Sequence, residues 1–229
     1  MYCAFVYCPC IFFRCRGFVS NMVAAVQRNL EDNCHAMLWL VTYSFLLRLP
    51  SEASFWVCFC AAVIVPPCLY QALPLCKCAP DSPNADGKQA IIWLDQNTIC
   101  MRLLRRKNRP NGSGVMKRLC TCRANPHTCL VHMLWDKFLA ALPEGTHPWA
   151  HITAGAARSR LRRILELLKV PGASMYGTHD LRRGHAEDMR ESGCTLAEIL
   201  AAGQWKSCAF LSYLNEVRLD HLFVSRQAW

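Results

Sequence analysis

Three short stretches in the C-terminal third decide the fold: Thr178–Ala186 (THDLRRGHA), Gly203–Trp205 (GQW) and Phe210–Leu214 (FLSYL). Within the first stretch His179 and Arg182 are three residues apart, so on a helix they share a face and can converge on one anion. A lone His-x-x-Arg is a weak signal that occurs by chance in many proteins. Here a Gly-x-Trp places its Trp 23 residues after the Arg, and a Tyr follows eight residues later, which makes the series specific.

This series resembles the catalytic domain of the tyrosine recombinase (phage integrase) family. Members carry His-x-x-Arg, then a His or Trp, then a nucleophilic Tyr at about these spacings. The family also has an earlier Arg followed closely by Glu, and a Lys in a β-hairpin. Two upstream motifs match: Arg48 in Leu46–Glu52 (LLRLPSE), with the Glu one place later than the commoner spacing, and Lys107 in Leu104–Arg109. The resemblance covers roughly residues 35–220, in the family's order.

The resemblance implies site-specific DNA recombination or integration, with strand cleavage and rejoining through a 3′-phosphotyrosyl intermediate at Tyr213. Charge builds on the nonbridging phosphate oxygens during such a transfer, and guanidinium groups bind these oxygens in a two-pronged fashion. Arg48 and Arg182 would take that role. A phenol with an ordinary pKa of about 10 needs a base to attack phosphorus, and His179 is the candidate.

Two further residues complete the implied catalytic set. Lys107 would protonate the leaving 5′ oxygen, and Trp205 would donate an indole hydrogen bond to a phosphate oxygen. Indole cannot exchange a proton, so Trp205 is excluded as a general acid. The covalent link to Tyr213 conserves the phosphodiester energy, so strand exchange requires no nucleotide cofactor and no metal.

The charge distribution agrees with a double-stranded DNA partner. The chain has 229 residues, 53% apolar and 18% charged, which is typical of a folded protein rather than a disordered one, and its net charge is +10. Residues 1–100 are neutral overall and hold eleven of the sixteen cysteines, whereas residues 101–229 carry the whole surplus. We expect synapsis with other recombinase protomers and phosphate contacts from the basic side chains outside the catalytic set, namely Arg105, Arg106, Arg109, Arg158, Arg160, Arg162 and Arg163.

The residue patterns predict a mainly α fold with a small antiparallel β-sheet. Three strands are expected, at Ala90–Leu94, Thr98–Leu104 and Val115–Cys122, with a turn at Arg109–Gly114 between the last two. Helices are expected at Cys34–Arg48, from His132 to Pro143, at Ala156–Lys169, at Leu181–Ser192 between Thr178 and Gly193, at Leu196–Ala202 after Thr195, and at Ser207–Tyr213.

A second group of residues has metal-binding chemistry: Cys120, Cys122, Cys129 and His132. Three thiols and an imidazole form a legitimate tetrahedral zinc set, so a structural zinc ion is one interpretation. However, Cys-x-Cys is tighter than the usual spacer of two to four residues. The alternative, buried small side chains beneath a hairpin, is therefore favoured by the sequence alone.

Domain organisation departs from the family in two ways. Residues 1–33 leave no room for the separate DNA-clamping domain that usually precedes the catalytic domain, which we assign to residues 34–229. The uncharged Ser54–Ala72 intervenes between the Arg48 motif and the sheet, where the family's chain continues promptly, and its deletion gives the smooth continuation LLRLPSEA-LPLCK. We hypothesise that it is a translated intron or a similar insertion, which predicts a eukaryotic gene derived from a transposable element.

The cysteines lack the regular spacing of a disulfide framework, so reduced thiols and an intracellular location are expected, in the nucleus if the source is eukaryotic. Two alternatives stay open. One is a degenerate, catalytically silent relative that only binds DNA. The other is a small membrane protein anchored by the uncharged Ser54–Leu75, against which Pro66–Pro67 near its middle would break a spanning helix.

Overall fold

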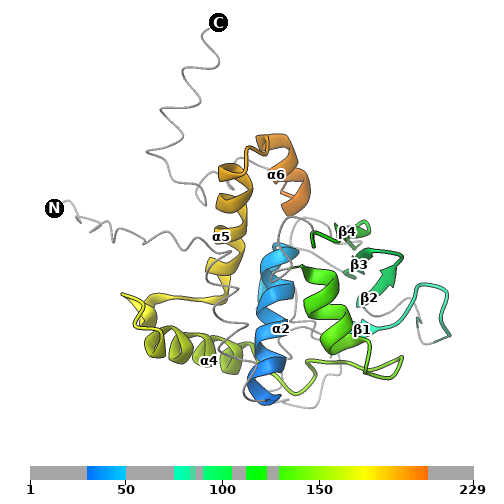
Figure 1. Cartoon of the computed structure of the whole chain (residues 1–229), viewed down its shortest axis with the longest axis horizontal. Helices are drawn as coiled ribbons and strands as arrows, with labels where there is room; N and C mark the ends of the chain where they lie inside the picture. The colour runs from blue at the N-terminus through cyan, green and yellow to red at the C-terminus, as the bar shows by residue number, and fades with distance from the viewer. Residues whose placement is uncertain are drawn as a thin grey trace, which may run out of the picture.

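The computed structural model describes residues 30–49, 75–83, 85, 90–104, 112–122 and 129–205 (Figure 1). This part of the chain is mainly helical, with one small sheet at the side of the helices. The elements, in chain order, are α2 (Leu30–Ser44), β1 (Leu75–Lys77), β2 (Ala90–Asp95), β3 (Thr98–Arg102), β4 (Met116–Leu119), η2 (Val131–Leu139), α4 (Ala154–Leu167), η3 (Ala173–Met175), α5 (Thr178–Glu191) and α6 (Leu196–Gly203).

The sheet has four strands in the order β1-β2-β3-β4 and is mixed. The three predicted strands are present, and β2, β3 and β4 pair antiparallel as expected. β1 pairs parallel to β2, with Leu75 opposite Ala90, so the prediction of an antiparallel sheet was wrong at this edge. The reason is that β1 has only three residues, too few for an alternating pattern, and its partner lies beyond a polar linker.

The helices that follow the sheet match the predicted bounds closely. Gly193 adopts the positive φ of 85° expected of a helix-ending glycine, and Thr195 caps α6 through its side chain. Gly177, not Thr178, is the N-cap of α5. The helix predicted from His132 is a π-helix, in which Ala140 N donates to Trp135 O. The predicted helix Ser207–Tyr213 lies outside the described residues.

The predicted helix Cys34–Arg48 ends earlier than expected. α2 stops at Ser44, and Leu46 then takes a left-handed φ of 53°, so Arg48 lies beyond the helix. Leu46 and Leu47 are buried, and the apolar sequence gives no polar or glycine stop signal. Tertiary packing, not local sequence, therefore ends this helix.

The core is centred on α2. Trp39 of α2 and Trp149 are both fully buried, and Trp149 Nε1 donates a hydrogen bond to Cys34 O at 3.0 Å. α5 packs on one side of α2 and η2 on another, with the sheet beyond η2 (Figure 1). α2 thus connects the helical half that carries His179 to the sheet.

The base of the predicted hairpin is formed as expected. Ser113 N donates to Leu103 O at 2.9 Å, and Ser113 Oγ accepts from Leu103 N at 2.8 Å. Gly112 has a φ of 95°, and a Cβ there would lie 3.0 Å from Leu104 O, so the position requires glycine. The residues of the hairpin tip predicted to contact DNA or to react, Arg105, Arg106, Lys107 and Arg109, lie outside the described residues.

The insertion hypothesis for Ser54–Ala72 also falls outside the described part, as do most residues of the 54–75 segment weighed as a membrane anchor. Leu75, the last residue of that segment, begins β1. Among the residues that the structure describes, none of the helices combines the length and apolar character needed to cross a bilayer.

One side chain fastens the sheet to the end of α2. Arg118 of β4 donates from Nε to Ser44 O at 2.6 Å, and its guanidinium lies 5.0 Å from the Phe45 ring centroid. This contact joins β4 to the last residue of α2, four residues before Arg48. Arg118 therefore fixes the position of β4 relative to the segment that leads to Arg48.

Arg118→Met should lower the free energy of unfolding by roughly 1.5–3 kcal/mol, because a charge-assisted hydrogen bond to a part-buried carbonyl is lost. Denaturant titration of both proteins would measure the difference. Arg158→Met, at an exposed position of α4, is the matched control and should change stability by less than about 0.5 kcal/mol. Equal effects of the two substitutions would contradict the anchoring role.

Candidate functional site

Arg182 lies where three separate segments meet. Arg182 is the fifth residue of α5 and is only 2% exposed. Nη1 donates to Leu46 O, in the segment after α2, and Nη2 donates to Gly203 O at 3.0 Å, at the end of α6. A buried guanidinium needs such acceptors to offset the loss of water. The Arg182 side chain therefore holds two segments next to the start of α5: the residues after α2, which include Arg48, and the Gly203–Trp205 stretch.

Trp205 covers the same guanidinium. The Arg182 Cζ lies 4.2 Å from the Trp205 ring centroid, a close cation–π distance. Trp205 is 8% exposed and packs with Leu46 and Ile199 in a small cluster apart from the main core. A Cβ on Gly203 would fall 1.8 Å from the Trp205 ring, so glycine is required for the indole to occupy this place.

His179 and Arg48 lie beside this junction. Burial lowers the pKa of His179 below its usual 6.5, and the positive charges of Arg48 and Arg182 lower it further. Both His179 and Arg48 are half-buried, whereas Arg182 is almost fully buried. At neutral pH the imidazole is therefore uncharged and can accept a proton, next to two guanidinium groups that favour an anion.

The local sequence explains why His179 sits at the first turn of α5. Gly177 precedes the helix in an extended conformation, and Asp180 Oδ2 accepts from Gly177 N at 2.8 Å. The helix N-terminus carries a partial positive charge, which favours bound anions and disfavours imidazolium. The start of α5 thus adds to the electrostatic effect of the arginines.

The structure brings together four of the six predicted catalytic residues: Arg48, His179, Arg182 and Trp205. Lys107 and Tyr213 lie outside the described residues. The structural contribution of Leu46 was not predicted, because its left-handed backbone is not signalled by a glycine or asparagine. Arg48 and Arg182, for which one role was expected, differ in burial.

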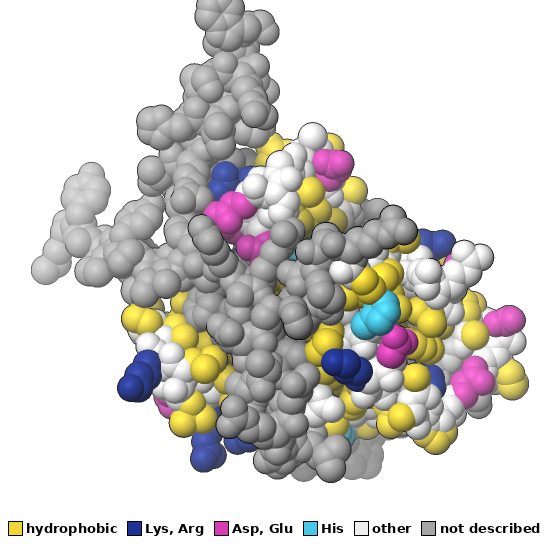
Figure 2. All heavy atoms as spheres, viewed as in Figure 1, with side chains coloured by type: hydrophobic (Ala, Val, Ile, Leu, Met, Phe, Trp, Pro, Cys, Tyr) yellow, Lys and Arg dark blue, Asp and Glu magenta, His cyan; other side chains and the backbone are white. Residues whose placement is uncertain are grey.

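The four predicted DNA-contacting arginines of α4 differ in exposure. Arg158 and Arg163 are exposed, and Arg160 is half-buried. Arg162 Nε donates to Tyr176 O at 2.7 Å, so this side chain also fixes the turn before α5. Figure 2 shows basic side chains over α4, at the lower left, next to hydrophobic ones. The helix offers cations to solvent along part of its length.

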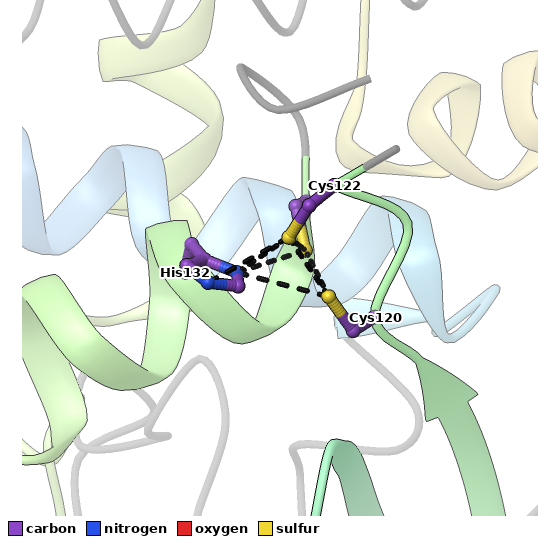
Figure 3. A group of neighbouring side chains, drawn as sticks. Cys120, Cys122 and His132 are labelled. Carbon is purple, nitrogen blue, oxygen red and sulfur yellow. Dashed lines mark hydrogen bonds between the residues drawn. The ribbon is translucent and has the colours of Figure 1, made fainter. Parts of the chain in front are cut away.

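The predicted metal ligands converge in space. The ligand atoms of Cys120, Cys122, Cys129 and His132 all lie within 4.8 Å of one another, at the junction of β4 and η2 (Figure 3). For tetrahedral zinc with Zn–S of about 2.3 Å, sulfur atoms should be about 3.8 Å apart. Cys129 Sγ meets this closely, at 3.5 Å from Cys122 Sγ and 3.6 Å from Cys120 Sγ. Cys120 Sγ and Cys122 Sγ are closer, at 2.8 Å. The group could hold a metal ion.

The thiols are unequal in acidity. Burial alone would raise the pKa of Cys129, but backbone and side-chain hydrogen bonds from His132 and the backbone N–H of Thr121 lower it to about 6. The pKa of Cys122 rises to about 12, first through its hydrogen bond with Cys120 and then through burial. These hydrogen bonds favour the thiolate of Cys129, whereas three thiolates at this spacing need a cation to balance them.

Comparison with known proteins assigns no family. A scan against models of known protein families gives no match, and a search of curated proteins finds none that matches significantly. The geometry of the two residue groups therefore carries the functional argument.

Arg48→Met should raise the pKa of His179, because a neighbouring positive charge that disfavours imidazolium is removed. NMR titration of the His179 ring measures this directly, with Arg158→Met as the control that leaves the pKa unchanged. Because the folded state binds this proton less readily than the unfolded chain, wild-type stability should fall as the pH drops below about 6.5, and the variant should lose less. An unchanged pKa in Arg48→Met would contradict the arrangement.

Gly203→Ala should destabilise the protein by about 1–3 kcal/mol, since the added methyl group displaces the Trp205 ring. Quenching of indole fluorescence and thermal unfolding would report the displacement and its cost. Gly155→Ala is the control: its Cβ meets only Thr153 Oγ1, at 3.9 Å, in an exposed part of α4. Helix propensity predicts that this control is neutral or stabilising by up to about 1 kcal/mol.

Proposed function

We propose that this chain cleaves and rejoins DNA strands by the tyrosine recombinase reaction. The observation that carries the proposal is the convergence of Arg48, His179, Arg182 and Trp205 from three separate segments, in the arrangement that the motif order implies. The mainly α fold with a small sheet, and a hairpin base formed where the Lys107 hairpin is expected, support it.

In the proposed reaction the Tyr213 oxygen attacks a backbone phosphorus and its proton passes to His179. The bond from phosphorus to the 5′ oxygen breaks, and Lys107 donates a proton to that leaving oxygen. The product is a 3′-phosphotyrosyl link and a free 5′-hydroxyl. Rejoining runs the same steps in reverse with a second 5′-hydroxyl, so no external energy source is consumed.

The electrostatics of His179 support its assignment as the base. A base must be unprotonated before the reaction, and the lowered pKa of His179 keeps the imidazole neutral at physiological pH. Arg48 is half-buried, and its positive charge acts on this ring, so an anionic phosphate approaching His179 would also be attracted by Arg48. Trp205 packs on Arg182 and keeps that guanidinium dehydrated.

A second candidate function is DNA binding without cleavage. Its specific support is the burial of Arg182, whose terminal nitrogens both donate to backbone carbonyls. A side chain held in this way stabilises the fold whether or not the chemistry occurs. In that case the exposed arginines of α4 would give salt-sensitive, nonspecific binding to duplex DNA.

A nicked suicide duplex distinguishes the two functions, because cleavage next to a nick releases a short fragment and traps the covalent intermediate. With a library of duplexes randomised around the nick, wild-type protein should form a protein–DNA adduct that survives denaturation in SDS and is removed by protease. Tyr213→Phe should abolish the adduct, while Tyr176→Phe, which alters a tyrosine packed against the core, should retain it. Retained salt-sensitive binding with no adduct from any duplex would establish the silent alternative instead.

We also propose that the Cys120, Cys122, Cys129 and His132 group holds a structural zinc ion. The thiolates and imidazole would supply four ligands, with no position open to water or substrate. The ion would compensate the charge of three thiolates and link the end of β4 to η2. It contributes stability and takes no part in strand transfer.

Purified protein should contain about one equivalent of zinc, and Cys129→Ser should reduce it to below a tenth of an equivalent. Chelation should lower the melting temperature of the wild type but not of Cys129→Ser. Cys194→Ser, at a half-buried cysteine outside the group, is the matched control and should retain the metal. A zinc content of the wild-type protein below about a tenth of an equivalent would contradict the proposed zinc site.

A further inference from the structure

We infer that Asp136 is the carboxylate partner of the metal-binding histidine, and that His132 binds the metal through Nδ1. This inference rests on the zinc site proposed above and assigns a further residue to it. Asp136 is not one of the four ligands, and it acts on the metal only through the imidazole ring.

The orientation of the imidazole carries the first step. Nδ1 of His132 lies 2.9 Å from Cys122 Sγ, 3.3 Å from Cys129 Sγ and 3.9 Å from Cys120 Sγ, so this nitrogen faces the space between the three sulfurs. In a tetrahedral site with the usual bond lengths, nitrogen and sulfur ligands are about 3.6 Å apart. The ring therefore presents Nδ1 to the position that a zinc ion would take.

The other ring nitrogen faces a carboxylate. Nε2 of His132 lies 3.8 Å from Asp136 Oδ2, although it also approaches Cys122 Sγ at 3.6 Å. Asp136 is four residues after His132 on η2, a spacing that places both side chains on one helix face. Both side chains are about half exposed. The 3.8 Å separation is longer than a hydrogen bond, so the proposed bond requires the ring and the carboxylate to move closer.

A carboxylate at this position selects one imidazole tautomer. If Asp136 accepts the Nε2 proton, the lone pair remains on Nδ1, which is the nitrogen that faces the thiols. Metal-bound histidines almost always donate their second N–H to a carboxylate, carbonyl or water, and such partners change metal affinity roughly ten- to a hundredfold. The chain supplies this partner from the same helix as the ligand.

A third observation indicates that the thiolate side of the site is also supported. Thr121 N donates to Cys129 Sγ at 3.4 Å, and the backbone N–H of His132 donates to the same sulfur. Such bonds stabilise a thiolate and orient it. Cys129, two residues before η2, and His132, in its first turn, thus have partners that point their ligand atoms toward Cys120 and Cys122.

The test measures zinc affinity by competition with a chromophoric chelator. Asp136→Asn should weaken zinc binding roughly ten- to a hundredfold, and Asp136→Glu, which retains a carboxylate on a longer side chain, should recover most of the affinity. Glu166→Gln, which neutralises an exposed carboxylate on α4, is the matched control and should bind as tightly as the wild type.

Long-range ¹H–¹⁵N spectra of the zinc-loaded wild type provide a readout that a purely structural residue would not affect. They should show metal on Nδ1 of His132 and a proton on Nε2, with faster solvent exchange of that proton in Asp136→Asn. Metal on Nε2, or unchanged zinc affinity in Asp136→Asn, would overturn the inference while leaving the zinc site intact. A wild type that binds no zinc would overturn both.

Discussion

The buried guanidinium of Arg182 is the interaction on which the candidate site depends. A charge removed from water is costly unless acceptors replace the lost solvent, and here Leu46 O, Gly203 O and the Trp205 ring do so. These groups come from two other segments, the residues after α2 and the Gly203–Trp205 stretch, so one side chain of α5 fixes three parts of the chain relative to one another. The left-handed backbone at Leu46, with a φ of 53°, is tolerated within this well-packed junction although it is unfavourable for leucine.

Local signals in the sequence were sufficient to predict α4, α5 and α6, because capping residues and apolar spacing act within a few positions. Thr195 and Gly193 are examples whose predicted positions the structure confirms. β1 could not be predicted, since three residues carry no periodicity and the parallel partner lies across a linker. The end of α2 was also missed, because the apolar residues after Ser44 continue the helical pattern while packing turns the chain.

The candidate site, like the fold, could be predicted only in part from the sequence. The resemblance to tyrosine recombinases implied one site for Arg48, His179, Arg182 and Trp205, and the structure places these four residues near one another. The burial of the two arginines could not be predicted, and it gives them different roles. Arg182 is buried and fixes the neighbouring segments, while the half-buried Arg48 keeps part of its surface in solvent. Within the proposed function, Arg48 is therefore the guanidinium that would contact a phosphate, and the buried Arg182 would contribute its positive charge to the same site without contacting the phosphate.

The metal group and the junction at Arg182 are connected through β4. This strand starts near the hairpin base at Ser113, is tied to Ser44 by Arg118, and ends at Leu119, one residue before Cys120, the first of the four candidate ligands. A zinc ion bound there would join the end of the strand to η2, while Arg118 joins its middle to the segment that precedes Arg48. The hairpin base at Leu103 and Ser113 would then be fixed on both sides. Within the proposed function, a fixed base meets the geometric demand that general acid catalysis places on a proton donor expected in that hairpin.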